Sequence, residues 1–228
     1  MCSRYSLTSP PEAVRQLFSL NLIEDYPPRY NIAPTQPVHF VQQSQSGERT
    51  AGLARWGLIP SWVKDPRTFS TLINARMESV AEKPSFRAAF RHRRCLIPAD
   101  GFYEWTGDAG SKQPHLIRLK NRDLFAFAGL WENWLGADGS EIETVAILTT
   151  AANADMTEIH DRMPVILQRD AYEGWLDCRS GTSLHAADLL APLPNGLLDA
   201  MAVSRKLNNS RFEGPELQTP AHAAEPLL

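Results

Sequence analysis

The sequence predicts a single α+β domain with a mostly antiparallel sheet or barrel-like core and short peripheral helices. A chain of 228 residues is long enough to bury one sizeable hydrophobic core. Short segments rich in β-branched and aromatic residues cluster in its middle, without the regular strand–helix alternation of a parallel sheet. The 17 prolines indicate many loops. These three observations favour a mixed fold around an antiparallel sheet.

Local patterns predict the individual elements. Apolar residues at helical spacing, after Ser9 and two prolines, predict a helix over 11–20. Recurrent prolines argue against a helix or a central strand over 26–34. Strands are predicted over 38–42, 52–58, 115–119, 124–130 and 144–149. Helices are predicted over 84–94, 153–160, 170–176 and 183–190.

The carboxyl-terminal segment 215–228 is rich in proline and alanine, and we expect it to be a flexible tail after a domain that spans residues 1–214. No apolar run in the sequence has the length of a signal peptide or a membrane span. We therefore expect a cytoplasmic protein, associated with the nucleoid if the cell is bacterial. We also expect a monomer.

Charge and cysteine content narrow the possible partners. Residues 49–94 contain ten Lys and Arg but only three acidic residues, although the net charge of the whole chain is −3. Such a basic stretch fits a polyanionic partner, and it is also typical of an ordinary solvated face. The three cysteines show no C-x-x-C spacing, which favours a reducing compartment and indicates neither a disulfide framework nor a zinc site.

Cys2 is the most informative single position. A cysteine so close to a terminus is ordinarily part of a frayed end. However, a methionine before a small side chain is commonly excised, and excision of Met1 would leave Cys2 with a free α-amine beside its thiol. An α-amine titrates near ~7.7–8.0, against ~10.4 for lysine, so it is the better nucleophile near neutral pH. It can condense with an aldehyde to an imine, onto which the thiol closes intramolecularly as a five-membered thiazolidine ring.

Four downstream strings contain residues that suit such a site: 55–62 (RWGLIPSW), 73–78 (INARME), 101–105 (GFYEW) and 159–164 (IHDRMP). Taken singly, each also has a structural interpretation. Trp62 fits loop packing, and Asn74 and Arg76 fit a turn and a surface. Glu104 fits a strand residue that faces solvent, and His160 fits a cation at the end of a helix.

Together and in this order, the strings resemble the SRAP (SOS response-associated peptidase) family, whose members begin with Met-Cys-Gly-Arg. The resemblance extends from Cys2 to Val203-Ser204-Arg205, with Asn208 after it. One position departs from the family, because Ser3 stands where the family usually has glycine. If that glycine allows a close approach to DNA or an unusual φ, a serine would crowd it. The resemblance implies the SRAP fold, a role in the SOS response to DNA damage, and no metal or organic cofactor.

The resemblance further implies that the protein captures abasic sites in single-stranded DNA through a covalent thiazolidine crosslink to Cys2, a lyase-like activity. Glu104 lies among aromatic residues that would remove its solvation and raise its pKa, and it would open the sugar and move protons. His160 resembles the family's second proton-transfer residue, a task that suits an imidazole near neutral pH. Asn74 would hold the Cys2 amine or the sugar by hydrogen bonds.

A DNA-binding set is implied in the same way. Four arginines would pair with phosphates, namely Arg4, Arg76, Arg162 and Arg205. Trp62 and Pro34 would fill space against unstacked bases. Asn31 and Thr149 would supply neutral polar contacts.

Two other function classes remain open. An N-terminal-nucleophile cysteine peptidase or amidase would use Cys2 with its own amine as base, and such a hydrolase could remove Met1 autocatalytically. It would require an oxyanion-binding donor pair and a peptide groove, neither of which can be read from the sequence. A noncovalent single-strand binder would not require Cys2. The acidic residues and the histidine within 155–161 do not predict a metal site, because they lack ligand spacing with any cysteine.

Overall fold

The fold is built around a closed five-stranded barrel. The computed structural model describes residues 2–44, 46–108, 110–179 and 183–221. The barrel strands pair in the order β10-β4-β3-β6-β9, and β9 pairs with β10 to close the ring. All these pairs are antiparallel except that of β10 with β4. The strands are β3 (Pro37–Gln43), β4 (Arg49–Trp56), β6 (Arg94–Ala99), β9 (Phe125–Leu135) and β10 (Glu141–Ala151).

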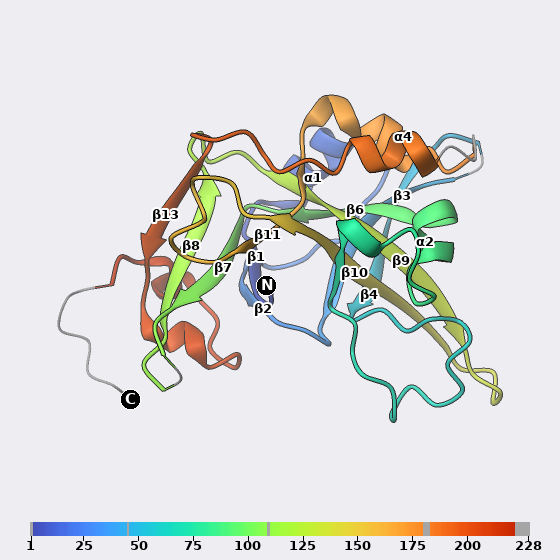
Figure 1. Ribbon diagram of the computed structural model, residues 1–228, viewed down its shortest axis with the longest axis horizontal. Helices are drawn as coiled ribbons and strands as arrows, with labels where there is room; N and C mark the ends of the chain where they lie inside the picture. The colour runs from blue at the N-terminus through green and yellow to red at the C-terminus, as the bar shows by residue number, and fades with distance from the viewer. Residues whose placement is uncertain (1, 45, 109, 180–182, 222–228) are drawn as a thin grey trace.

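A second, five-stranded antiparallel sheet lies to one side of the barrel, in the order β13-β8-β7-β1-β2 (Figure 1). Its strands are β1 (Tyr5–Leu7), β2 (Arg29–Ile32), β7 (Gly101–Thr106), β8 (Gln113–Leu119) and β13 (Leu198–Ala202). Only Asp100 separates β6 from β7, so the chain passes directly from the barrel into the second sheet. The Asp100 carboxylate accepts hydrogen bonds from Ser6, Thr8 and Ser9, which fixes the beginning of the chain against this junction.

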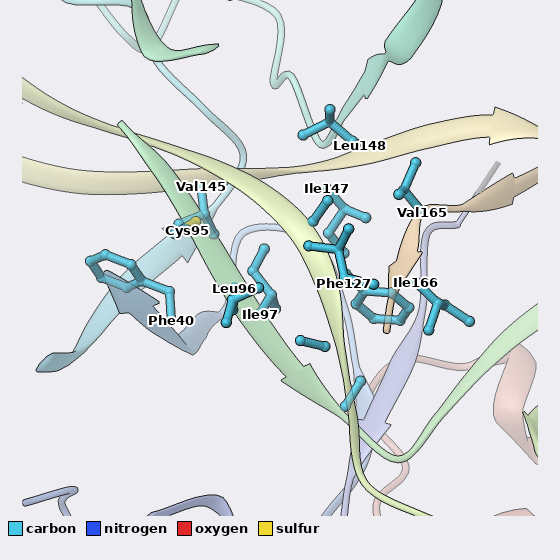
Figure 2. Close-up of a cluster of buried hydrophobic side chains, with 14 of the residues drawn as sticks. Phe40, Cys95, Leu96, Ile97, Phe127, Val145, Ile147, Leu148, Val165 and Ile166 are labelled. Carbon is cyan, nitrogen blue, oxygen red and sulfur yellow. The ribbon is translucent and has the colours of Figure 1, made fainter. Parts of the chain in front are cut away.

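Apolar side chains of the barrel strands fill its interior (Figure 2). Strand alternation sends every second residue inward, and full burial of a large apolar side chain contributes about 1.5–3 kcal/mol. Tyr5 joins β1 to this core, because its ring meets the rings of Trp56 and Phe127 edge-on at centroid distances of 5.2 and 5.7 Å. The amino-terminal strand is therefore held against the barrel by aromatic packing.

Short elements cover the outside of the barrel. Helix α1 (Pro11–Phe18) begins at the second of two consecutive prolines and ends where Ser19 takes the left-handed conformation at φ 55°, and it buries Val14 and Phe18. The other helices are α2 (Arg87–His92), α3 (Tyr172–Leu176), α4 (Ser183–Asp188) and the 3-10 helices η1 (Met77–Ser79), η2 (Arg169–Ala171), η3 (Arg205–Asn208) and η4 (Pro215–Gln218). The short strands are β5 (Asn74–Arg76) and β11 (Arg162–Pro164), which pair with β10, and β12 (Ile166–Leu167), which pairs with β9. No helix among the described residues is long and apolar enough to cross a membrane.

The predicted fold class is confirmed: this is one α+β domain with mostly antiparallel sheets and few, short helices. Each of the five predicted strands overlaps an observed one, with β9 and β10 longer than expected. The helices predicted over 11–20, 170–176 and 183–190 correspond to α1, η2 with α3, and α4. The helix predicted over 84–94 is shorter, because Arg94 already begins β6.

One local prediction is wrong. Residues 153–160 form consecutive turns instead of a helix. Polar side chains of this segment bond to a distant loop instead: Asn153 donates to the Leu193 carbonyl, and Asp155 accepts from the Gly196 and Leu198 amides. The segment 26–34 forms neither a helix nor a central strand, as predicted. It contains the edge strand β2, and an edge position tolerates prolines on either side of the strand.

The packed chain extends past residue 214, the predicted end of the domain. Leu217 of η4 is fully buried in a small cluster with Tyr103 and Leu207. The remainder of the predicted tail, from residue 222 onward, lies outside the described residues.

Candidate active site and nucleic-acid interface

Four separate segments bring the predicted reactive groups to one place. Cys2 precedes β1, and β1 pairs with β7, the strand that carries Glu104. Asn74 lies on β5, beside β10, and His160 lies on the turns between β10 and β11. Electrostatic interactions link Cys2 to Glu104 and Glu104 to His160.

The Cys2 thiol is fully buried within the hydrophobic core. This differs from the ordinary behaviour of a residue near a chain terminus, which supports little core. Its Sγ faces the Arg4 carbonyl at 3.8 Å, the length of a weak sulfur hydrogen bond. Burial, and then the negative charge of Glu104, raise the pKa of the thiol well above its ordinary range. Near neutral pH the Cys2 sulfur is therefore present as a protonated thiol.

Asn74 bonds directly to the backbone of Cys2. Its Nδ2 donates to the Cys2 carbonyl over 2.8 Å, which fixes the orientation of the amide because a carbonyl can only accept. The Asn74 Oδ1 is buried and has no hydrogen-bond partner within the described chain. A buried acceptor without a partner is unfavourable, so this oxygen is suited to accept a hydrogen bond from an amine or a hydroxyl group that enters the site.

Glu104 is a buried carboxyl group, with 3% of its surface exposed. Burial raises its pKa, and the nearby His160 opposes that shift. The direction agrees with the expectation drawn from its aromatic neighbours. A carboxyl group with a raised pKa can donate as well as accept a proton near neutral pH, which is the requirement for acid–base catalysis.

The ring of His160 is oriented by its own turn. Its Nδ1 accepts the Arg162 amide N–H over 2.9 Å, and the same atom lies 2.8 Å from the Asp161 carboxylate. One nitrogen cannot accept the first bond and donate the second at once. We favour the amide bond, because the amide is a fixed donor whereas Asp161 is a largely exposed side chain that can move. The neutral ring then carries its proton on Nε2.

Arg4 and Arg162, both predicted to pair with phosphates, already have partners in the protein. Arg4 donates to Asn31 Oδ1 over 2.6 Å and to the Leu207 carbonyl over 3.1 Å. Arg162 forms a two-pronged ion pair with Glu78 and donates to the Thr149 carbonyl over 2.7 Å. Asn31 and Thr149 themselves are fully buried and hold these arginines in place. Their proposed contacts with DNA remain predictions.

The other predicted DNA-binding residues lie nearer the surface. Arg76, at the end of β5, is exposed and forms no ion pair with another described residue. Trp62 is 58% exposed and meets Phe69 edge-on. Pro34 is half-buried beside Thr35, which has a left-handed backbone at φ 72°. Arg205 begins η3, where its Nε donates to Gln113 over 3.3 Å.

Sequence reasoning missed two residues of this site, although both lie in strings that it quoted. Glu78, the last residue of INARME, neutralises Arg162. Trp105, the last residue of GFYEW, lies under the Arg4 guanidinium at 5.8 Å and donates to Asn208. An acidic residue two positions after a predicted phosphate-binding arginine was the signal for the first. For the second, the sequence held no signal, because Asn208 is distant in the chain.

Comparison with known proteins identifies the family. Residues 1–210 match the family described as SOS response associated peptidase (SRAP). The chain belongs to the SRAP family. It is 40% identical over 221 residues to abasic site processing protein YoqW of Bacillus subtilis, covering 95% of this chain and 98% of that protein. It is 31% identical to abasic site processing protein HMCES of Xenopus tropicalis, covering 95% of this chain and 77% of that protein.

A solved structure has the same fold. A crystal structure of a protein from Bacteroides thetaiotaomicron superimposes with a TM-score of 0.82 at 27% identity, over 97% of this chain and all of that one. Ser3, where SRAP members usually have glycine, is not among the described residues with a positive φ. Its backbone is therefore accessible to any side chain, and the substitution strains nothing. Among the described residues of this SRAP chain, no cluster of His, Cys, Asp and Glu is placed to hold a metal ion.

Proposed function

We propose that this SRAP protein captures abasic sites in single-stranded DNA by linking the sugar aldehyde to Cys2 once Met1 has been removed. The observation that supports this most is the meeting of Cys2, Asn74 and Glu104 in one buried site. The similarity to abasic site processing proteins over nearly the whole chain supports the choice of substrate.

The chemistry balances without a cofactor. The Cys2 amine adds to C1′ of the open sugar and gives a carbinolamine, which loses one water to form an imine. The thiol sulfur then bonds to the imine carbon while its proton passes to the nitrogen, and a thiazolidine results. The net change is one water released. The ring closes quickly because both nucleophiles belong to one residue.

The neighbours of Cys2 supply the proton transfers. Glu104, with its raised pKa, protonates the ring oxygen as the sugar opens and takes a proton back from the C1′ hydroxyl, and it then protonates the hydroxyl that leaves as water. The Asn74 Oδ1 accepts a hydrogen bond from the Cys2 amine and orients it. His160, which carries its proton on Nε2, is the second proton-transfer residue and exchanges a proton with the sugar hydroxyl. Arg4, Arg76, Arg162 and Arg205 carry the phosphates of the strand, with Trp62 and Pro34 against its bases.

The alternative is a cysteine peptidase or amidase that uses the same Cys2. This alternative is retained because the matching family is described as a peptidase family. An uncharged Cys2 thiol beside a carboxyl group disfavours it, because thiol peptidases activate their sulfur as a thiolate next to a cation. If a variant that no longer crosslinks DNA still hydrolyses peptides, the alternative would be supported.

Substitution of Cys2 tests the proposed chemistry. Cys2→Ala keeps an amine after methionine removal but has no sulfur, so it should form only an imine. We expect the denaturant-stable adduct with abasic DNA to disappear, while an adduct trapped by borohydride persists. Cys178→Ser, which changes a half-buried thiol elsewhere, is the matched control and should crosslink normally. Since Cys2 is buried, thermal melting must show that the variant is folded. A stable adduct formed by folded Cys2→Ala would overturn the proposal.

A further inference from the structure

We propose that a basic pocket beside η3 forms a second binding site for the DNA strand, which holds a phosphate and stacks a base several nucleotides from the lesion. The inference rests on the proposed function and extends it. The pocket has a volume of about 240 Å³. Its lining includes three cations, two amides and one aromatic ring: Lys112, Arg205, Lys206, Asn208, Asn209 and Phe212.

The charges of this pocket fit a polyanion. None of its lining residues is acidic. Lys112 and Lys206 are both exposed, and neither ammonium group has an ion-pair partner among the residues that the structure describes. The neighbouring Glu213 keeps its negative charge, but its carboxylate accepts the Tyr30 amide and is not part of the pocket lining. Two uncompensated cations in a concave surface attract a phosphate, and each contact made releases counterions.

Phe212 gives the pocket a feature specific to nucleic acid. The side chain is 44% exposed and lies in a pocket lined by cations, where its ring is available for stacking. A single-stranded strand offers a base for stacking next to each phosphate, and such stacking does not depend on sequence. A free anion or an acidic peptide would use the lysines but would leave this ring exposed.

Hydrogen bonds connect the pocket to the segment that carries the nucleophile. Arg4 donates to the carbonyl of Leu207, which lies in the chain between the lining residues Lys206 and Asn208. Asn31 donates to the carbonyls of Asn209 and Phe212 and accepts from Arg4. Arg4 follows Cys2 by two residues, which span at most roughly 7 Å when extended, so Arg4 joins the nucleophile's segment directly to η3.

The segments that line the pocket and the segment that carries Trp62 lie on opposite sides of β1. In Figure 1 the turn between β7 and β8 and the red segment with η3 are on one side of β1. The segment between β4 and β5, which carries Trp62, is on the other side. A strand that stacks on Trp62 and reaches Cys2 would continue into the pocket. We therefore expect binding to the pocket to depend on the nucleotides on only one side of the lesion, either 5′ or 3′.

Oligonucleotide length and charge removal together test this site. Single-stranded oligonucleotides with one abasic site are lengthened on the 5′ or the 3′ side, and affinity is measured against salt. For the double variant Lys112→Ala/Lys206→Ala, we expect the slope of log K against log salt to fall by up to ~1.4 with one of the two extended oligonucleotides and to be unchanged with the other. Lys120→Ala is the control, because Lys120 follows β8 at the end opposite Lys112.

Phe212 is tested separately with a fluorescent base analogue placed at successive positions of the longer flank. We expect quenching at one position, its loss in Phe212→Leu, and unchanged melting temperatures because the ring supports little core. Equal affinity, slope and quenching in wild type and variants would overturn the pocket proposal, even if wild type crosslinks normally. Failure of the wild type to crosslink any abasic strand would instead overturn the proposed function, and binding of undamaged strands would still decide the pocket.

Discussion

At the scale of single residues, the site combines groups that are unfavourable for stability with groups that hold them in place. Glu104 and Cys2 are both buried, and burial disfavours the charged form of each. Asn74 contributes a buried oxygen with no partner within the described chain. Such features are typical of reactive sites, where the surrounding fold maintains groups that would be selected against elsewhere.

Glu104→Gln tests the catalytic role of this carboxyl group. If Glu104 moves protons, the variant should form the adduct on the order of 10²–10⁴-fold more slowly, without a comparable loss of affinity for undamaged single strands. As a proton donor, Glu104 is active below its raised pKa, so the wild-type rate should fall as pH rises through that value. The variant should lack this limb of the pH–rate profile. An unchanged rate in Glu104→Gln would remove the residue from the mechanism.

The same shift predicts how stability depends on pH. The folded-state pKa of Glu104 is above its unfolded value of ~4.3, so the folded state binds the proton more tightly. The stability that this pKa difference contributes is fully present below the unfolded-state pKa. It is lost as pH rises through the raised folded-state pKa. Glu104→Gln should therefore gain thermal stability relative to wild type as pH increases from 4 to 8, as measured by melting curves. If the melting temperatures of wild type and Glu104→Gln changed in parallel with pH, the raised pKa of Glu104 would be contradicted.

At the scale of elements, β5 illustrates how a short strand can organise a site. Its three residues alternate, so Asn74 and Arg76 share one face while Ala75 is buried on the other. Pairing with β10 places Asn74 beside Ile147 and Arg76 beside Thr149. The sequence could not predict this strand, because three residues carry no usable period and its partner lies about 70 positions away.

Two arginines near this strand should differ in their importance for binding. Arg76 is exposed without an ion pair in the described chain, whereas a phosphate must compete with Glu78 for Arg162. Arg76→Ala should lower the salt slope of single-strand binding by up to ~0.7, the effect of one contact. Arg162→Ala should lower it less. The reverse order, measured on the same undamaged oligonucleotide, would contradict the assignment.

Element prediction failed where distant contacts override local preference. The helical pattern of 153–160 gives way to turns because Asn153 and Asp155 bond to the loop 193–198. The loop 193–198 cannot be recognised as a partner from local sequence. The prediction for 26–34 held, because β2 is an edge strand that needs to pair on one side only.

At the scale of the whole molecule, composition and strand pattern were enough to predict the α+β class and most of the barrel strands. Of the second sheet only β8 was predicted, because β1 and β2 are short and the pairing partner of β13 is remote in the chain; β7 was missed although it has six residues and pairs with the next strand, β8. The candidate site could be named from four strings, but only the fold shows that Cys2, Asn74, Glu104 and His160 converge. The partners that hold Arg4 and Arg162 also depend on this convergence, which is why they could not be foreseen.

The central claim is that an amine and a thiol of one processed residue form the bond to DNA. Intact mass measured after mixing the cellular protein with an abasic single-stranded oligonucleotide, followed by peptide mapping, tests it most directly. We predict one new species, heavier than the protein lacking Met1 by the mass of the oligonucleotide less one water, with the modification on the peptide that begins at Cys2. An adduct that retains Met1, or one attached at another residue, would contradict the account.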